Sequence, residues 1–101
     1  MKDLTQCRVE LDAIDKQLVA LFEQRMRVSR DVARYKHAHH LDILDVSREE
    51  AVLQSRAAQV TEDALHQPTV QLFREIMRLS REEQRHVLDG ITQAQADTAN
   101  R

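Results

Sequence analysis

The sequence predicts an all-helical fold, and three observations support this class. The chain of 101 residues contains one glycine, one proline, two phenylalanines and one tyrosine, so residues that favour turns and strands are scarce. Charged residues make up 32% of the chain, which suits helices with solvated outer faces. Apolar residues recur at steps of three and four over long stretches, which places them on one face of a helix. We expect three helices per chain, long, short and medium in chain order.

The first expected helix spans Leu4 to Tyr35 and contains neither glycine nor proline. Its apolar seam runs through Leu4, Cys7, Leu11, Ile14, Leu18, Leu21, Arg25, Val28, Val32 and Tyr35. Such a helix is about 50 Å long, whereas a compact chain of this size has a radius of gyration of about 13 Å. Because the helix overhangs its own domain with apolar residues at both ends, we expect a second chain to cover it in an obligate helical oligomer.

The second helix follows a loop that the sequence predicts over Lys36 to Leu44. Asp45 is a suitable N-cap, and Ser47 with Glu50 three residues later forms an alternative capping box. We expect this helix to end near Leu65, shortly before the proline of the chain.

The third helix is expected to begin at Gln67 and Pro68, because proline suits the first turn of a helix. Gly90 is expected to close it, since glycine favours helix C-termini. Residues 91–101 are mostly polar and are expected to form a frayed tail. Residues 1–90 would then form a single helical domain.

Polar and charged side chains interrupt the apolar seams of all three helices. They are Arg25 on the first, Glu49 on the second, and Ser80 and Gln84 on the third. Lys36 follows Arg25 by eleven residues, and at about 100° per residue it returns to within about 20° of the same helix face. Buried cations are costly unless paired, and one acid cannot neutralise two of them. The seams therefore predict a small, water-excluding site for a carboxylate-bearing molecule.

Other interpretations of the polar residues remain open. Polar residues on a helical seam also fix register in coiled coils, so a non-catalytic helical dimerisation or regulatory module is one alternative. An arginine stripe on the third helix could contact nucleic acid, but interspersed acids favour a solvated face. The stripe contains Arg74, Arg78, Arg81 and Arg85, and the acids are Glu75, Glu82 and Glu83. Three loop histidines, His37, His39 and His40, could bind a metal, but no second cluster has ligand spacing.

Charge and composition argue against several kinds of partner. The net charge is -2 with basic residues in every segment, which is not typical of a nucleic-acid or membrane surface. No apolar run is long enough to cross a bilayer and no signal peptide is evident. Cys7 cannot form an internal disulfide and suits a reducing compartment. We therefore expect a cytoplasmic protein without a metal or cofactor.

The order of polar residues along the chain resembles that of the all-helical chorismate mutases of the AroQ class. The matching residues are Arg8, Asp15, Arg25, Lys36, Asp45, Arg48, Glu49, Ser80 and Gln84. The resemblance extends from about Leu4 to Leu88 and includes the Asp-Val-Ser-Arg-Glu-Glu turn that starts at Asp45. It implies an intertwined homodimer of three-helix chains. It also implies an isomerase that rearranges chorismate to prephenate in phenylalanine and tyrosine biosynthesis.

The resemblance implies two groups of substrate contacts. Arg25 and the partner's Arg8 would bind the two carboxylates of chorismate, and Ser80 would assist them. Within one straight helix Arg8 lies about 25 Å from Arg25, which is why the implied Arg8 contact is made across the dimer.

The remaining matching residues would act at the ether oxygen and the ring hydroxyl. Lys36 and Gln84 would donate hydrogen bonds to the ether oxygen, so Lys36, Gln84 and Arg25 are the expected catalytic residues. Glu49 would accept a hydrogen bond from the ring hydroxyl with help from the backbone near Asp45, and Arg48 would line the pocket. Isochorismate-pyruvate lyases and amino-deoxychorismate mutases share this scaffold, and both remain alternatives. Domains of this family are also often fused to a dehydratase, a dehydrogenase or a synthase.

Overall fold

The computed structural model describes residues 1–100, which form three α-helices and one short 3₁₀ helix. In chain order these are α1 (Leu4–Ala38), α2 (Val46–Gln59), η1 (Asp63–Leu65) and α3 (His66–Ala99). The all-helical prediction is confirmed. The predicted order of lengths is wrong for the last helix, because α3 has 34 residues and α1 has 35.

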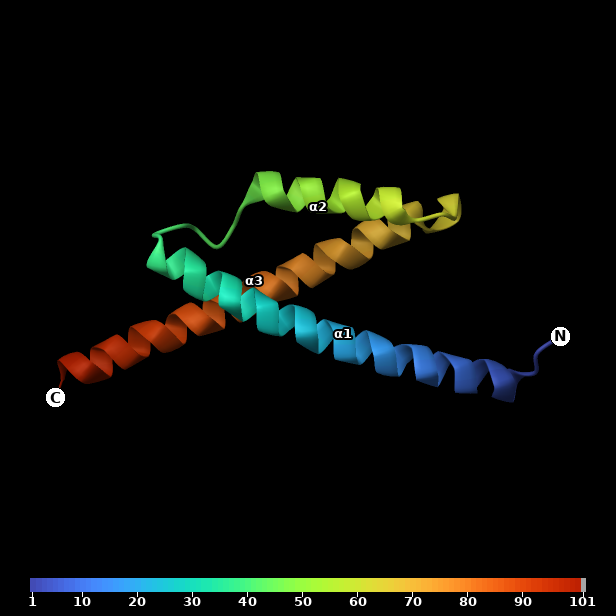
Figure 1. The fold of residues 1–101 in the computed structure, drawn as a ribbon, viewed down its shortest axis with the longest axis horizontal. Coiled ribbons are helices and arrows are strands. Elements are labelled where there is room, and N and C mark those ends of the chain that lie inside the picture. The colour runs from blue at the N-terminus through green and yellow to red at the C-terminus, as the bar shows by residue number, and fades with distance from the viewer. Residues whose placement is uncertain (101) are drawn as a thin grey trace.

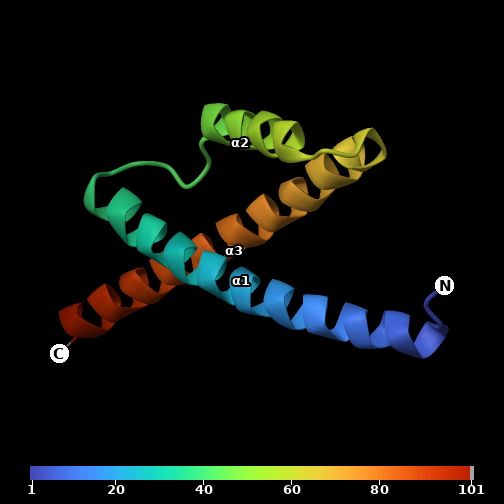
Figure 2. The same ribbon diagram turned by 45° about the vertical axis from the view of Figure 1, so that its right-hand side comes forward.

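Helices α1 and α3 cross as two long rods, and α2 lies beside the first half of α3 (Figure 1). The turned view shows the same crossing, with the N-terminal half of α1 and the C-terminal half of α3 projecting to opposite sides (Figure 2). Both α1 and α2 pack against α3. The radius of gyration is 18.3 Å, compared with about 13 Å for a compact chain of this length. This extended shape suggests an oligomer.

Helix α1 has well-defined caps at both ends. Asp3 and Gln6 form a capping box, in which the Asp3 side chain accepts from the Gln6 N–H at 2.8 Å and the Gln6 side chain accepts from the Asp3 N–H at 2.9 Å. At the other end His40 adopts a left-handed conformation with φ 56°. The Leu41 N–H donates to the Lys36 carbonyl at 2.8 Å and the His40 N–H to the His37 carbonyl at 3.3 Å, a Schellman motif. The predicted loop therefore starts too early, since Lys36 lies within α1.

Helix α2 begins at the Asp45 cap, whose side chain accepts from the Arg48 N–H at 3.0 Å. The alternative capping box at Ser47 is wrong, because Ser47 lies inside the helix that Asp45 already caps. The predicted end near Leu65 is also wrong. The helix ends at Gln59 and Val60 is extended, since the β-branched Val60 and Thr61 are weak helix formers.

Helix α3 begins at His66, so Pro68 lies in its first turn, where the missing N–H removes no helical hydrogen bond. The predicted end at Gly90 is wrong, because Gly90 keeps helical backbone without a positive φ. The residues after Gly90 remain helical to Ala99. Two side-chain hydrogen bonds support these last turns: Gln93 Nε2 donates to Asp97 Oδ1 at 2.9 Å, and Thr98 Oγ1 donates to the Ala94 carbonyl at 3.0 Å. These last turns are nevertheless exposed.

The core is small and centred on α3. Val52 and Leu53 of α2 pack with Met77 of α3, and the half-buried Val70 and Phe73 cover them. Helix α1 adds a different buried set at its crossing with α3, consisting of Met26, Ser29 and Ala33.

Most of the predicted apolar seam of α1 is exposed. Leu4, Leu11, Ile14, Leu18, Leu21, Val28 and Tyr35 are each more than half exposed. The chain exposes 8135 Å² in total, about 2,200 Å² more than a compact protein of its mass. The face of α1 that packs within the chain is thus the neighbour of the predicted seam, and most of the seam stays uncovered by residues 1–100. No helix in this described part of the chain is long and apolar enough to span a membrane.

Candidate active site

A cavity of about 270 Å³ lies between the second half of α1, the start of α2 and the middle of α3. It brings together all of the predicted site residues except Arg8, namely Arg25, Lys36, Asp45, Arg48, Glu49, Ser80 and Gln84. Apolar walls are supplied by Val28, Val32, Ile43, Val52 and Met77. The polar interruptions of three separate seams therefore meet at one place.

Helix α1 presents two cations to the cavity. Burial lowers the pKa of the Arg25 guanidinium from its ordinary value, and the positive charges of Arg56 and Arg48 lower it further. Lys36 is half-buried, and its Nζ donates to the Ile43 carbonyl at 2.5 Å. Neither side chain forms an ion pair with a carboxylate in residues 1–100. An anionic ligand could supply the counter-charge that residues 1–100 do not provide for these two side chains.

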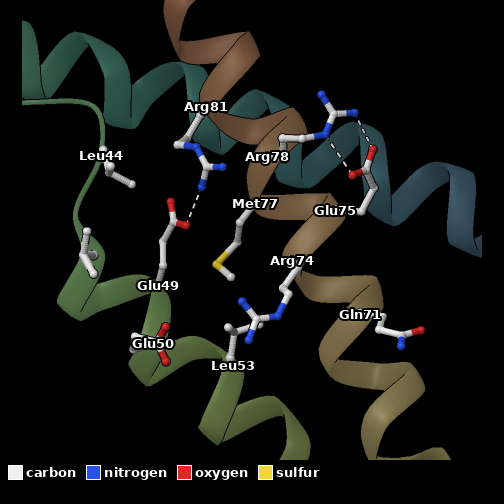
Figure 3. A pocket seen from close by; sticks show the side chains of 11 residues that line it. Leu44, Glu49, Glu50, Leu53, Gln71, Arg74, Glu75, Met77, Arg78 and Arg81 are labelled. Atoms are coloured by element: carbon white, nitrogen blue, oxygen red, sulfur yellow. Dashed lines mark hydrogen bonds and ion pairs between the residues drawn. The ribbon is translucent and has the colours of Figure 1, made fainter.

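The first turn of α2 contributes the acids of the site. Asp45 is occupied as the helix cap, and Arg48, three residues later, is exposed at the rim. Glu49 is half-buried and forms an ion pair with Arg81 of α3. Figure 3 shows this pair beside a second cavity of about 420 Å³ between α2 and α3, which Glu49 and Arg81 also line.

Arg81 is a site residue that the sequence interpretation missed. The arginine stripe was expected on a solvated face, and Arg78 fits that expectation with its exposed pairs to Glu75 and Glu82. Arg81 instead is half-buried and faces the cavity. The signal was its position four residues after Met77, which places it beside the apolar seam of α3.

Ser29 is the second missed residue. It is buried on the α1 face that meets α3, where its hydroxyl contacts Ser80 and Gln84. Its position four residues after Arg25 was the available signal, because such residues are neighbours on a helix surface.

Arg8 does not reach this cavity within one chain. It is exposed on the N-terminal half of α1, and along a straight helix it lies about 25 Å from Arg25. The structure thus brings together the predicted site residues of one chain and leaves Arg8 apart.

The charges that line the cavity are unequal. Arg25, Lys36, Arg48 and Arg81 are basic, whereas Asp45 and Glu49 are acidic. In residues 1–100 no group of three His, Cys, Asp or Glu side chains is arranged to hold a metal ion. The fold and the cavity therefore define a class: an all-helical protein with a small cavity whose lining has more basic than acidic side chains, which is chemically suited to an organic anion.

Comparison with known proteins gives the family. The family model "Chorismate mutase type II" matches residues 7–85, and the chain belongs to this family of isomerases. A curated relative, the T-protein of Haemophilus influenzae, is 32% identical over 81 residues, which is 79% of this chain and 22% of that protein. The chain thus spans about a fifth of the length of that relative. No solved structure matches the chain.

Proposed function

We propose that this protein is a chorismate mutase that rearranges chorismate to prephenate, an activity expected in the cytoplasm. The observation that carries the proposal is the meeting of Arg25, Lys36, Ser80 and Gln84 around one cationic cavity. In this reaction a carbon–oxygen bond breaks while a carbon–carbon bond forms within one molecule, and no proton is transferred. The protein therefore has to hold the reactive conformer and stabilise the developing negative charge.

Recognition of the two carboxylates falls to the arginines. Arg25 is desolvated and has no carboxylate partner among residues 1–100, so a substrate carboxylate supplies the missing counter-charge. Ser80 lines the same cavity and offers a hydroxyl. The second carboxylate is bound by Arg8 of the partner subunit.

Stabilisation of the ether oxygen falls to Lys36 and Gln84. As the carbon–oxygen bond lengthens, this oxygen gains negative charge, and donors that are already oriented stabilise it without reorganisation. Lys36 is anchored through the Ile43 carbonyl, which leaves two of its three N–H groups for a ligand. Gln84 is buried and neutral, so its amide donates at any pH.

Glu49 accepts a hydrogen bond from the ring hydroxyl of the substrate. Its carboxylate is held by Arg81 at the cavity wall, which keeps an acceptor facing the substrate. Asp45 and Arg48 complete the rim.

Assembly as a homodimer completes this arrangement. The exposed apolar seam of α1 and the excess of accessible surface support a second copy as its cover. In such a dimer the N-terminal half of α1 reaches its neighbour's cavity and brings Arg8 with it. Residues 1–90 would form the catalytic domain, with residues 91–101 outside it.

The proposal is tested by following chorismate loss with the purified protein and identifying the product by NMR. We expect prephenate, and we expect Lys36→Met to lower kcat by roughly 10²–10³-fold, as loss of one charge-stabilising donor does. Arg34→Met is the matched control, because Arg34 is an exposed cation on the same helix, paired with Asp31. Absence of turnover by a folded protein would contradict the proposal, and isochorismate and amino-deoxychorismate would then be the substrates to examine.

A further inference from the structure

Three polar side chains are buried together where α1 crosses α3. Ser29 of α1 and Ser80 and Gln84 of α3 are 5%, 8% and 7% exposed. Buried polar groups are costly unless they hydrogen-bond. If α1 and α3 needed only small residues in order to approach closely, alanine would serve equally well. The same face of α1 has such an alanine at the buried Ala33.

The hydrogen bonds of this cluster converge on the Ser29 hydroxyl. Ser29 Oγ donates to the Ser80 carbonyl at 3.2 Å and contacts Ser80 Oγ closely. Gln84 Nε2 donates to Ser29 Oγ at 3.2 Å and to Ser80 Oγ at 3.5 Å. Ser29 is therefore the link between the long first helix and the amide of Gln84.

The other end of the same amide has no partner. Gln84 Oε1 is buried and is the buried side-chain polar atom in residues 1–100 that lacks a hydrogen bond. A hydroxyl can both donate and accept a hydrogen bond, whereas the amide oxygen of glutamine only accepts and its NH₂ group only donates. If the amide turns end for end, Ser29 donates to Oε1 and Nε2 is free to donate to a ligand, while the Ser80 hydroxyl remains available to the substrate carboxylate.

We propose that Ser29 is a positioning residue that orients the Gln84 amide, so that Oε1 accepts from the Ser29 hydroxyl while Nε2 faces the ether oxygen of the substrate. This inference rests on the proposed function. A bound oxygen acceptor satisfies the released N–H groups, so substrate selects the turned amide, and Ser29 holds it there. Ser29 acts through Gln84 and does not itself contact the reacting atoms.

The sharpest test uses Gln84→Glu as a reporter. Activity of this variant falls as pH rises through the pKa of the introduced carboxyl, because only the protonated acid donates to the ether oxygen. A hydroxyl that donates to the carboxylate lowers that pKa. Adding Ser29→Ala should therefore move the midpoint of the pH–rate profile upward by about one unit.

The comparison isolates the hydroxyl because all other charges are unchanged. The groups that face the cavity are Arg25 and Lys36 of α1, Asp45, Arg48 and Glu49 at the start of α2, and Arg81 of α3. Ser55→Ala in the same Gln84→Glu background is the matched control, since Ser55 is exposed on α2 outside the cavity. It should leave the midpoint unchanged.

A second measurement separates hydrogen bonding from packing in the otherwise unaltered enzyme. Ser29→Ala should lower kcat about tenfold with KM within twofold, and Ser29→Cys, which keeps the volume but is a weak hydrogen-bonding group, should behave like Ser29→Ala. Circular dichroism verifies folding of each variant. An unchanged midpoint, or full activity of Ser29→Cys, overturns the role of Ser29 while prephenate formation by the wild type stands. A wild type that forms no prephenate overturns the proposed function and this inference with it.

Discussion

The two halves of α1 have the same helical periodicity but opposite surroundings. The second half crosses α3, buries Met26, Ser29 and Ala33, and faces the cavity with Arg25 and Lys36. In the first half, residues 4–24, every side chain is exposed except the half-buried Cys7. Yet this stretch contains seven leucine, isoleucine and valine residues, against two in residues 25–38. An apolar face thus indicates that a helix will be covered, but not whether its own chain provides the cover. The following predictions test this contrast.

The largest effect is expected from a charge on the exposed half. Leu18→Glu would place an unpaired carboxylate on the seam that a second chain covers in our proposal, so we expect assembly to be lost and prephenate formation to fall by roughly 10³-fold. Light scattering and the initial rate measure the two effects. Gln17→Glu adds the same charge one residue away from the seam and should change neither. A monomeric Leu18→Glu protein with full activity would show that the site needs no partner.

Complementation tests whether the two halves of α1 contribute to different active sites of the proposed dimer. Arg8→Ala and Arg25→Ala should each lower activity by roughly 10²–10³-fold, because each removes the partner of a desolvated carboxylate. After subunit exchange of the two inactive chains, half of the dimers are mixed and each contains one intact site, so activity should recover to about one quarter of the wild-type value. Recovery is measured after mass spectrometry has verified exchange. Persistent inactivity of the mixed dimers would place Arg8 outside the site.

At the crossing of α1 and α3, a substitution at Gln84 should lower activity without lowering stability. Gln84→Met keeps the side-chain volume but removes the donor, so kcat should fall by about 10²-fold. The same change removes the buried Oε1 that has no partner, so the Tm should stay the same or rise. A calorimetric scan together with the rate gives both quantities. A lower Tm with unchanged kcat would mean that Gln84 is structural only.

A smaller effect is expected at the Glu49–Arg81 pair. Arg81→Met removes the ion-pair partner of Glu49, so the Glu49 carboxylate is held less firmly at the cavity wall. Half-exposed ion pairs stabilise by about 1 kcal/mol or less. We therefore expect KM to rise about three- to fivefold with little change in kcat. Arg78→Met is the control, because Arg78 is exposed and pairs with Glu75 and Glu82 outside the 270 Å³ cavity. Equal effects of both substitutions would argue against a specific role for Arg81.

The smallest effect is expected at the end of α1. His40→Gly should raise the free energy of unfolding by up to about 1 kcal/mol, because glycine adopts the left-handed conformation of this position without steric cost. Urea denaturation measures the change, and His37→Gly, inside α1, should be destabilising by a similar amount. Activity should be unaffected by His40→Gly. A loss of stability there would mean that the imidazole makes contacts worth more than the backbone strain.

The sequence predicted well those features that depend on spacing along one helix. The shared face of Arg25 and Lys36 and the seam positions of Ser80 and Gln84 follow from helical geometry alone, and the structure brings them to one cavity. For the cap of α2 the sequence left Asp45 and Ser47 open, and the structure has Asp45. The roles of these residues in catalysis remain predictions.

The sequence did not predict which of two adjacent faces of α1 packs against α3, nor where α2 and α3 end. The α1 face of Met26, Ser29 and Ala33 is adjacent to the apolar seam, and periodicity does not tell which of two adjacent faces meets α3. The ends of α2 and α3 were misplaced because a few tenths of a kcal/mol per residue decide them. Gly90 alone does not stop a helix whose next turns contain the good helix formers Gln93, Ala94, Gln95 and Ala96. Arg81 was assigned to solvent because the acids interspersed with the arginine stripe, Glu75, Glu82 and Glu83, indicated a solvated face.

The exposed half of α1 also makes the specific activity depend on the concentration of the protein. If this half folds only against a second copy, folding and association are one bimolecular event, and each tenfold dilution removes about 1.4 kcal/mol of apparent stability. Specific activity then falls on dilution in the proposed dimer, because separated chains lose both Arg8 and the cover of the helix that carries Arg25. A cell that makes little of this protein would lose flux faster than in proportion to its amount.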